Sequence, residues 1–333
     1  MSMLILGAGG FLGLNLVDAV IASGQVPRCG RRTRSNVIAL RERRVPLVHA
    51  DLDSRRELLA AMQGCVTVLH VAGHYPRLSL DRAGTLATGL GQVENVLDAA
   101  AGAGVRRLIY VSSAATVAPS PGGWPSDERH VFPAEPGFGT YHDLKWAMEH
   151  VVLAERRFET VVACPGACIG PWDLRVGTSA LVVALARGLD PPHPDGIINL
   201  VDATDVARAL VELAMLSSPP RRVLLSGVNR GLHALLCELA ERYRVPRPSA
   251  PLPAAEAIAL ADSEERRVAL IGGRPRLSRE IADLVVHGVP IDAHLARSAL
   301  GLEFRPFEET LDAADAWNRR MRILPPLSAE VAR

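Results

Sequence analysis

Three features of the 333-residue sequence predict an α/β fold with a doubly wound parallel sheet and a smaller, mostly helical C-terminal lobe. Short β-type runs alternate with longer amphipathic stretches over the first two thirds of the chain. A glycine-rich turn directly follows the first of these runs. The last third has a mainly helical pattern. Together these features are typical of a Rossmann-type domain that has a second lobe attached.

The expected strands of the first two thirds are short apolar runs bounded by turn residues: Met3–Leu6, Val26–Cys29, Leu47–His49, Val66–Val71, Arg107–Ser112 and Thr160–Cys164. Apolar residues at helical spacing predict helices between them, notably over Gly13–Ser23, Leu86–Ala103 and Thr140–Arg156. The segment Ala118–Gly139 is rich in Pro and Gly, so we expect a long surface loop of the kind that often binds ligands.

Beyond Gly170-Pro171 the simple alternation ends. The runs Ile197–Leu200 and Arg222–Ser226, with a helix over Ala203–Leu216 between them, are expected to return to the sheet. From Leu232 onward the pattern is mainly helical. We therefore predict a dinucleotide-binding Rossmann domain of residues 1–171 and 197–228, and a smaller substrate-binding lobe of residues 172–196 and 229–333.

The composition excludes several classes of protein. The 37 Lys and Arg residues nearly balance the 36 Asp and Glu residues, so a net charge of +1 does not favour binding to nucleic acid or to a membrane surface. No apolar run approaches the roughly 20 residues that a membrane span needs. The five cysteines are odd in number and scattered, which fits reduced thiols in a cytoplasmic protein, and we expect no metal site.

Gly7, Gly10 and Gly13 lie between the first strand and the first helix, with Phe11 and Leu12 in the opening turn of that helix. Glycines at this place let the backbone turn tightly and approach a pyrophosphate, and the helix N-terminus offers free N–H groups to it. The spacing is Gly-x-x-Gly-x-x-Gly, and the alternative interpretation is a glycine-rich turn without a ligand. We predict that these five residues bind a dinucleotide.

The end of the second strand indicates which dinucleotide binds. No Asp or Glu occurs between Ala19 and Arg41, so no carboxylate is available there for a ribose 2′-hydroxyl. Instead Arg31 and Arg32 follow Gly30, and a guanidinium can pair with a 2′-phosphate. We therefore predict NADP, with NAD possible; the alternative is a solvated basic turn. After the third strand, Asp51 and Leu52 are expected to contact the adenine.

Tyr141 and Lys145 are four residues apart in a helical pattern and therefore share one face of the helix. A nearby ammonium and the positive nicotinamide ring would lower the phenol pKa towards the working range, and Lys145 could also hold the nicotinamide ribose. Ser113 follows the fifth strand, where its hydroxyl could hold a substrate oxygen. We predict that these three residues are catalytic, although a Tyr-x-x-x-Lys pair alone is more often a surface feature.

These motifs together resemble the extended short-chain dehydrogenase/reductase family, within the NAD-dependent epimerase/dehydratase superfamily. The resemblance extends from Leu4 to about Leu324 and is strongest to the dihydroflavonol reductase and 3β-hydroxysteroid dehydrogenase branch, in which the second serine after the strand, here Ser113, is the catalytic one. The segments with this resemblance are Tyr110–Val117, Pro165-Gly166, Gly170–Asp173, Val201–Ala207, Leu300-Gly301 and Trp317. We also expect Val71, Ala72, Gly73 and Pro165 to contact the cofactor.

The sequence departs from the family pattern at several positions. Leu144 precedes the catalytic Lys where the family usually has Ser, and the Asn expected near Thr88-Gly89 is absent, so a proton relay built on that Asn is in doubt. Ala114 and Ala167 occupy positions where the sugar-nucleotide epimerases have a catalytic Ser or Thr and a diphosphate-binding Asn. Both alanines count against a nucleotide-sugar substrate.

The resulting hypothesis is an NADPH-dependent ketoreductase, or the reverse alcohol dehydrogenase, that acts on a small or hydrophobic carbonyl compound. The alternatives are a nucleotide-sugar epimerase or dehydratase with tightly bound NAD, and a non-catalytic protein that senses NADP. His74, Tyr75 and Trp172 are the expected substrate-binding residues. A homodimer through the helices at Leu86–Ala103 and Thr140–Arg156 is implied by family analogy alone.

Overall fold

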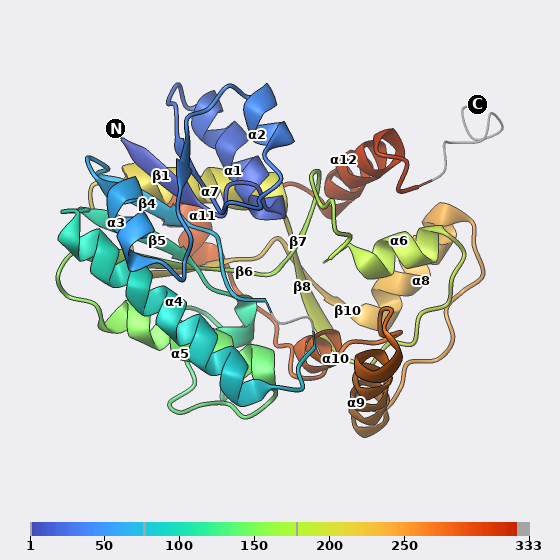
Figure 1. The fold of residues 1–333 in the computed structure, drawn as a ribbon. Helices are drawn as coiled ribbons and strands as arrows, with labels where there is room; N and C mark the ends of the chain where they lie inside the picture. The colour runs from blue at the N-terminus through green and yellow to red at the C-terminus, as the bar shows by residue number, and fades with distance from the viewer. Residues whose placement is uncertain (1, 76–77, 178, 325–333) are drawn as a thin grey trace.

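The computed structural model describes residues 2–75, 78–177 and 179–324. Its main sheet has seven strands in the order β3-β2-β1-β4-β5-β6-β9, and every pairing is parallel (Figure 1). The predicted parallel α/β sheet is therefore confirmed. Its strands are β1 (Met3–Leu6), β2 (Arg28–Arg31), β3 (Leu47–His49), β4 (Thr67–His70), β5 (Arg107–Val111), β6 (Glu159–Pro165) and β9 (Arg222–Leu225).

Helices cover both faces of this sheet, because alternate strand residues point to opposite sides. Met3 and Ile5 of β1 belong to one hydrophobic core, and Leu4 and Leu6 belong to the other. Burial on both faces explains why the strands read as continuous apolar runs. The first core lies under α1 (Phe11–Ala22), α2 (Ile38–Glu42), α7 (Ala203–Met215) and α11 (His294–Leu300), and the second under α3 (Arg55–Met62), α4 (Arg82–Gly102) and α5 (Thr140–Ala154).

A second, three-stranded sheet has the order β10-β8-β7, with β7 (Ala167–Ile169), β8 (Ile197–Asp202) and β10 (Val228–Gly231). The prediction that Ile197–Leu200 returns to the main sheet is wrong, whereas the same prediction for Arg222–Ser226 is confirmed. Strand β8 pairs in parallel with β7 and antiparallel with β10, whereas β9 alone pairs with β6 at the edge of the main sheet.

The C-terminal third is mainly helical, as predicted, and most of its helices gather around the small sheet (Figure 1). One exception is α11, which packs against α7 and β9 of the main sheet. The division of the chain at the predicted lobe boundaries stays a prediction. The helices around the small sheet are α6 (Ala180–Ala186), α8 (Leu232–Tyr243), α9 (Ala254–Ile271), α10 (Arg279–Val286) and α12 (Phe307–Arg320).

Two local predictions need correction. Strand β2 begins at Arg28, two residues later than expected, because Pro27 has no N–H to give to the sheet and Val26 lies exposed. The segment 118–139 is a long loop, but it is not confined to the surface: Ser126 is fully buried and forms a bridge with Ile291. Within the described part of the chain, none of the helices has both the length and the apolar character required to cross a membrane.

The turn between β1 and α1 requires glycine at two positions. Gly7 has a φ of +88°, and a Cβ there would lie 2.7 Å from the backbone nitrogen of Ala72. A Cβ on Gly13 would overlap the carbonyl oxygen of Gly7. The close approach of these backbones brings the turn after β1 against the segment that follows β4.

We expect Gly13→Ala to lower the free energy of unfolding by about 1–3 kcal/mol, because the added methyl group overlaps backbone atoms that cannot move independently. The matched control is Gly91→Ala in α4, where a Cβ meets no atom within 4 Å. That change should raise stability by about 0.5–1 kcal/mol through helix propensity. Urea denaturation of both variants measures the difference, and equal effects would contradict the packing described for the turn.

Candidate active site

The structure brings Ser113, Tyr141 and Lys145 together at the carboxyl end of the main sheet. Ser113 follows β5, while Tyr141 and Lys145 lie on one face of α5, and all three residues are buried. The Lys145 Nζ atom is 5.9 Å from the centre of the Tyr141 ring. Ser113 is hydrogen bonded to the phenol of Tyr141. The spacing seen in the sequence therefore corresponds to one cluster in space.

Burial raises the pKa of Tyr141 well above its ordinary value, and the carboxylate of Glu280 raises it further. Hydrogen bonds with Ser113 and Tyr75 act in the opposite direction. The lowering of this pKa expected from Lys145 together with a bound nicotinamide ring stays a prediction, because burial outweighs the effect of the protein's own neighbouring groups. A phenol that is protonated at neutral pH can donate its proton to a substrate oxygen.

Burial also changes the pKa of Lys145. Removal from water lowers the pKa of its ammonium to about 8, while the nearby acidic groups of Glu280, Cys164 and Glu149 raise it. The Nζ atom lies 6.0 Å from the centre of the Tyr110 ring, so Lys145 is enclosed between two aromatic rings. The side chain is held beside the phenol.

Sequence analysis missed Glu280, which α10 of the C-terminal part places beside the catalytic set. The Tyr75 hydroxyl donates a hydrogen bond to Glu280 Oε1 at 2.5 Å, and the rings of Tyr75 and Tyr141 are 5.3 Å apart. Tyr75, predicted to bind substrate, thus lies against Tyr141. A single acidic residue in a mainly helical segment gives no sequence signal, because the place of Glu280 in the fold depends on how α10 packs against α5.

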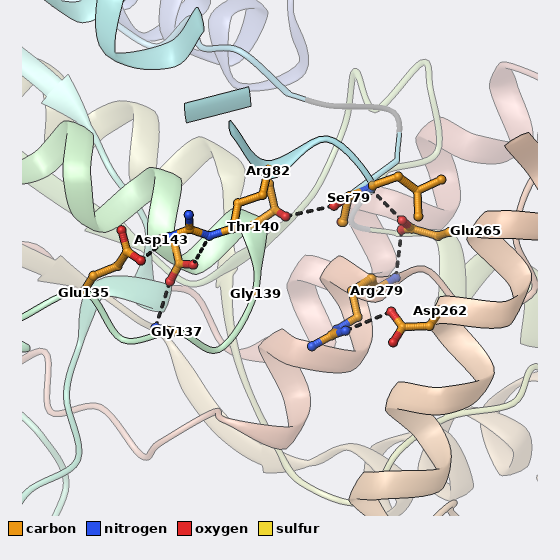
Figure 2. Close-up of a pocket in the computed structure, with 11 residues that line it drawn as sticks. Ser79, Arg82, Glu135, Gly137, Gly139, Thr140, Asp143, Asp262, Glu265 and Arg279 are labelled. Carbon is orange, nitrogen blue, oxygen red and sulfur yellow. Dashed lines mark hydrogen bonds and ion pairs between the residues drawn. The ribbon is translucent and has the colours of Figure 1, made fainter. Parts of the chain in front are cut away.

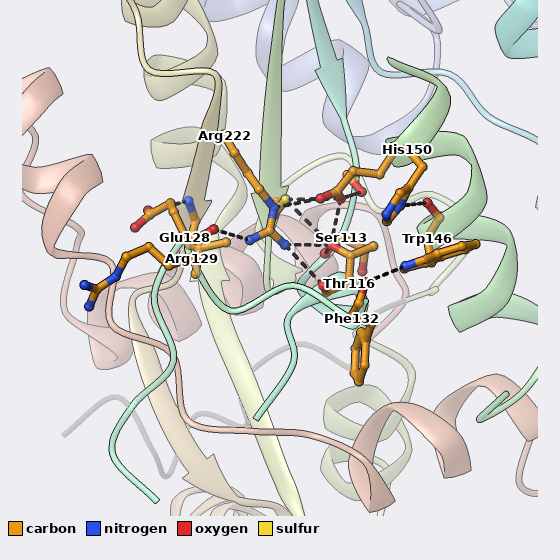
Figure 3. Close-up of polar contacts among 12 residues, drawn as sticks. Ser113, Thr116, Glu128, Arg129, Phe132, Trp146, His150 and Arg222 are labelled. Atoms are coloured by element: carbon orange, nitrogen blue, oxygen red, sulfur yellow. Dashed lines mark hydrogen bonds and ion pairs between the residues drawn. The ribbon is translucent and has the colours of Figure 1, made fainter. Parts of the chain in front are cut away.

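A buried polar network fixes the loop that contains Ser113 (Figure 3). The carboxylate of Glu149, in α5, accepts hydrogen bonds from Ser112 Oγ at 2.5 Å and Thr116 Oγ1 at 2.7 Å, and from Arg222 Nε at 2.7 Å. Arg222, in β9, also donates to the carbonyl oxygens of Thr116 and Glu128. Because the network joins α5 to both sides of Ser113, it sets the distance between Ser113 and the helix of Tyr141.

The glycine turn has the geometry of a pyrophosphate cradle. Gly10 caps α1 with no side-chain hydrogen bond, so the N–H groups of the first turn, at Phe11, Leu12 and Gly13, point out of the helix end. The segment Val71–Gly73 lies against Gly7, since Val71 N donates to the carbonyl of Leu6 at 3.0 Å. Pro165 ends β6 at the same edge of the sheet. These residues fit a bound dinucleotide.

The predicted ribose and adenine residues lie at the ends of β2 and β3. The Arg31 Nη2 atom is 2.7 Å from His49 Nε2, and Arg32 is exposed. Asp51 accepts a hydrogen bond from the backbone N–H of Asp53, and Leu52 is buried in the core under α3 and α4. Arg31 and Arg32 lie at the carboxyl end of β2, the strand that pairs with β1, and the binding of a 2′-phosphate by these arginines stays a prediction.

The other predicted substrate residues lie apart from one another. His74 is half-buried on the loop that follows β4. Trp172 has an unusual φ of +76°, with the Arg43 guanidinium 4.3 Å from its ring centre and the Trp317 ring centre at 6.0 Å. These contacts of Trp172 are with the end of α2 and with α12, and they favour a packing role.

A cavity of about 440 Å³ lies beside the catalytic set, between the N-terminal ends of α4 and α5 and the helices α9 and α10 (Figure 2). Its arginines are already paired: Arg82 with Asp143 and Glu135, and Arg279 with Asp262. These ion pairs join α4 to α5 and α9 to α10 around the cavity.

The parallel sheet, the glycine cradle and the Ser-Tyr-Lys set define a Rossmann-type enzyme of the nicotinamide dinucleotide class. The model of the NAD dependent epimerase/dehydratase family matches residues 3–221, so the chain belongs to that family, as an extended short-chain dehydrogenase/reductase. Solved structures of similar fold include complexes with NAD and with NADPH.

Among individual proteins, the chain is 30% identical over 331 residues to sterol demethylase protein B of Methylococcus capsulatus, covering 97% of this chain and 100% of the relative. It is 28% identical over 322 residues to a putative dihydroflavonol 4-reductase of Synechocystis, covering 94% and 93%. A crystal structure of a nucleoside-diphosphate-sugar epimerase from Pseudomonas aeruginosa is similar with a TM-score of 0.80 and 25% identity, covering 97% and 99%.

We expect Glu149→Ala to destabilise the protein by about 3–5 kcal/mol, because it leaves the Arg222 guanidinium buried without its carboxylate. The control is Arg247→Ala, which breaks the exposed pair with Glu241 and should change stability by less than about 1 kcal/mol. Chemical denaturation gives both values. A loss at Glu149 no larger than the loss at Arg247 would show that the network does not fix the loop.

Proposed function

We propose that this protein is an NADPH-dependent ketoreductase, or the reverse alcohol dehydrogenase, that acts on a carbonyl group of a small or hydrophobic metabolite. The observation on which the proposal rests is the position of a protonated phenol, Tyr141, beside the Ser113 hydroxyl and the Lys145 ammonium. This arrangement supplies a proton donor, a hydrogen-bond donor and a cation at one point of the sheet edge.

The roles follow from the chemistry of each group. The reduced dinucleotide, when bound, supplies a hydride to the carbonyl carbon. Tyr141 donates the proton that the carbonyl oxygen then needs, and its high pKa keeps that proton in place until charge develops on the oxygen. Ser113 orients and polarises the same oxygen, and Lys145 holds the ribose.

The residues around the set favour a substrate without a nucleotide group. Ala114 and Ala167 have no side-chain polar atom where an epimerase would hold a sugar or a diphosphate. The relatives over the full chain are named as a sterol demethylase protein and a putative dihydroflavonol 4-reductase, and neither name refers to a nucleotide sugar. The proposal is tested by incubating the protein and NADPH with a dihydroflavonol, a 3-oxosteroid or isovaleraldehyde. A loss of NADPH absorbance that depends on one of these carbonyl compounds is the expected result.

A nucleotide-sugar epimerase is the second candidate, supported by the likeness to the Pseudomonas aeruginosa structure. Purified protein that retains NAD and interconverts UDP-sugars without net NADPH consumption would replace the first proposal with this one. Reduction of a panel compound at the expense of NADPH would exclude it as the main activity.

We expect Tyr141→Phe to lower kcat by about 10³-fold or more, since the proton donor is removed, while the affinity for NADPH changes less than about threefold. Tyr243→Phe is the control, because Tyr243 donates to Asp315 between α8 and α12 and lies outside the catalytic set. Steady-state kinetics and a fluorescence titration with NADPH measure the two effects. A Tyr141 variant that kept over a tenth of the activity would end the assignment.

We expect the double change Arg31→Ala and Arg32→Ala to raise the Michaelis constant for NADPH by about tenfold or more and to leave that for NADH nearly unchanged. The reason is the loss of charge-assisted hydrogen bonds to the 2′-phosphate, which NADH lacks. Arg56→Ala, in α3, is the control for a loss of positive charge elsewhere. Equal effects on the two cofactors would dismiss the predicted preference.

A further inference from the structure

The proton that Tyr141 donates must be replaced after each turnover. This chain has no Asn near Thr88-Gly89 of α4 that could support a proton relay. A larger side chain would not fit at Gly89 as the residues stand, because a Cβ there would overlap the Leu144 side chain. Lys145 is buried between two aromatic rings. Tyr141 therefore needs another route for protons to solvent.

Tyr75 and Glu280 are placed to form that route. The Tyr75 hydroxyl donates to Glu280 Oε1 at 2.5 Å, and its oxygen is hydrogen bonded to the phenol of Tyr141. The two tyrosine rings are 5.3 Å apart and tilted by 51°. The three side chains come from the loop after β4, from α5 and from α10, so the chain of hydrogen bonds exists only in the folded protein.

Tyr141 is the most enclosed of the three groups in this chain of hydrogen bonds, which runs from Tyr141 through Tyr75 to Glu280. Tyr141 is 8% exposed, Glu280 is half-buried, and Tyr75 is 57% exposed. A proton can therefore reach Glu280 or Tyr75 from water, whereas Tyr141 has little direct access to it. An enclosed proton donor that is joined to groups within reach of water is what a relay requires.

We propose that Glu280 and Tyr75 form the proton relay that recharges Tyr141 during carbonyl reduction. The inference rests on the proposed ketoreductase function. During reduction the carbonyl carbon gains a hydride, with its two electrons, from the reduced nicotinamide dinucleotide, and the carbonyl oxygen takes the proton of Tyr141. Tyr141 takes the proton of Tyr75, Tyr75 takes the proton of the Glu280 carboxyl group, and water protonates Glu280 again. In oxidation every proton moves the other way.

The electrostatic surroundings of Glu280 suit this role. Burial raises the pKa of Glu280 to about 6, the hydrogen bond from Tyr75 and the charge of Lys145 lower it, and Glu265 raises it. Glu265 is itself held by the backbone N–H groups of Ser79 and Arg279. Among the described residues, Tyr75, Tyr141, Lys145 and Glu265 are the titratable groups that face Glu280. A carboxyl group that titrates near neutral pH can both release and accept a proton there.

The relay predicts a specific pH dependence. Reduction needs protonated Glu280, so kcat should fall as pH rises through about 6, while kcat for alcohol oxidation should rise over the same interval. Glu280→Gln keeps an acceptor for Tyr75 but cannot release a proton, and Tyr75→Phe keeps the ring but breaks the chain. Each should lower kcat by about 10- to 100-fold, leave KM within about threefold, and remove the inflection near pH 6.

The matched control is the pair of Tyr243→Phe and Asp315→Asn, which alters a tyrosine–carboxylate hydrogen bond of 2.8 Å between α8 and α12. Both control variants should keep the pH profile of the unmodified enzyme. The rates are measured with NADPH and whichever of the dihydroflavonol, the 3-oxosteroid and isovaleraldehyde is reduced fastest. If Glu280→Gln or Tyr75→Phe lowers thermal stability but keeps the pH profile, the contact is only structural and the relay is refuted.

An infrared titration of the carboxyl stretch, as the difference between the full chain and its Glu280→Gln variant, needs no turnover. The relay requires Glu280 to titrate well above an ordinary carboxyl group, and it requires Tyr75→Phe to raise that pKa further. An ordinary value that Tyr75→Phe leaves unchanged overturns the proposal. If no panel compound is reduced, the proposed function fails, and this titration still decides whether the chain of hydrogen bonds exists.

Discussion

The buried ion pair between Glu149 and Arg222 is the interaction on which the geometry of the site depends. Glu149 lies on the same face of α5 as Lys145 and Tyr141, at helical spacing, and its carboxylate also binds Ser112 and Thr116 on either side of Ser113. Arg222 extends the connection to β9 at the edge of the main sheet. One buried carboxylate therefore sets the helix, the loop and the sheet edge relative to one another.

The same site depends on a second contact that joins distant parts of the chain. Helix α10 brings Glu280 to Tyr75 and Tyr141, and Arg279, its neighbour, pairs with Asp262 of α9 and Asp283 of α10. The C-terminal part thus contributes a titratable group, Glu280, to the cluster around Tyr141. The cradle, Ser113, Tyr141 and Tyr75 come from the part of the chain that forms the main sheet and its helices, and α10 supplies Glu280, the end of the proposed path for protons.

Local features of the sequence predicted the parts of the site that depend on short-range geometry. The turn from Gly7 to Gly13 and the spacing of Tyr141 and Lys145 follow from backbone conformation and helix period alone. The shift in the pKa of Tyr141 could not be predicted in this way, because the direction of that shift depends on how completely the fold excludes water from the phenol. Glu280 and the Glu149–Arg222 pair were also inaccessible, since residues far apart in sequence meet only after packing. Strand β8 was assigned to the wrong sheet because a short apolar run is expected for a buried strand of the main sheet and of the small sheet alike.

We propose that the Tyr141 phenol protonates the substrate oxygen next to the nicotinamide ring. A crystal structure with NADP⁺ and a bound alcohol product tests this role of Tyr141 most directly. We expect the pyrophosphate at the first turn of α1, the Lys145 ammonium on the nicotinamide ribose, and the Tyr141 hydroxyl within hydrogen-bond distance of the alcohol oxygen. A structure in which that hydroxyl faces solvent, or lies far from the nicotinamide C4 atom with the dinucleotide in place, would contradict the account.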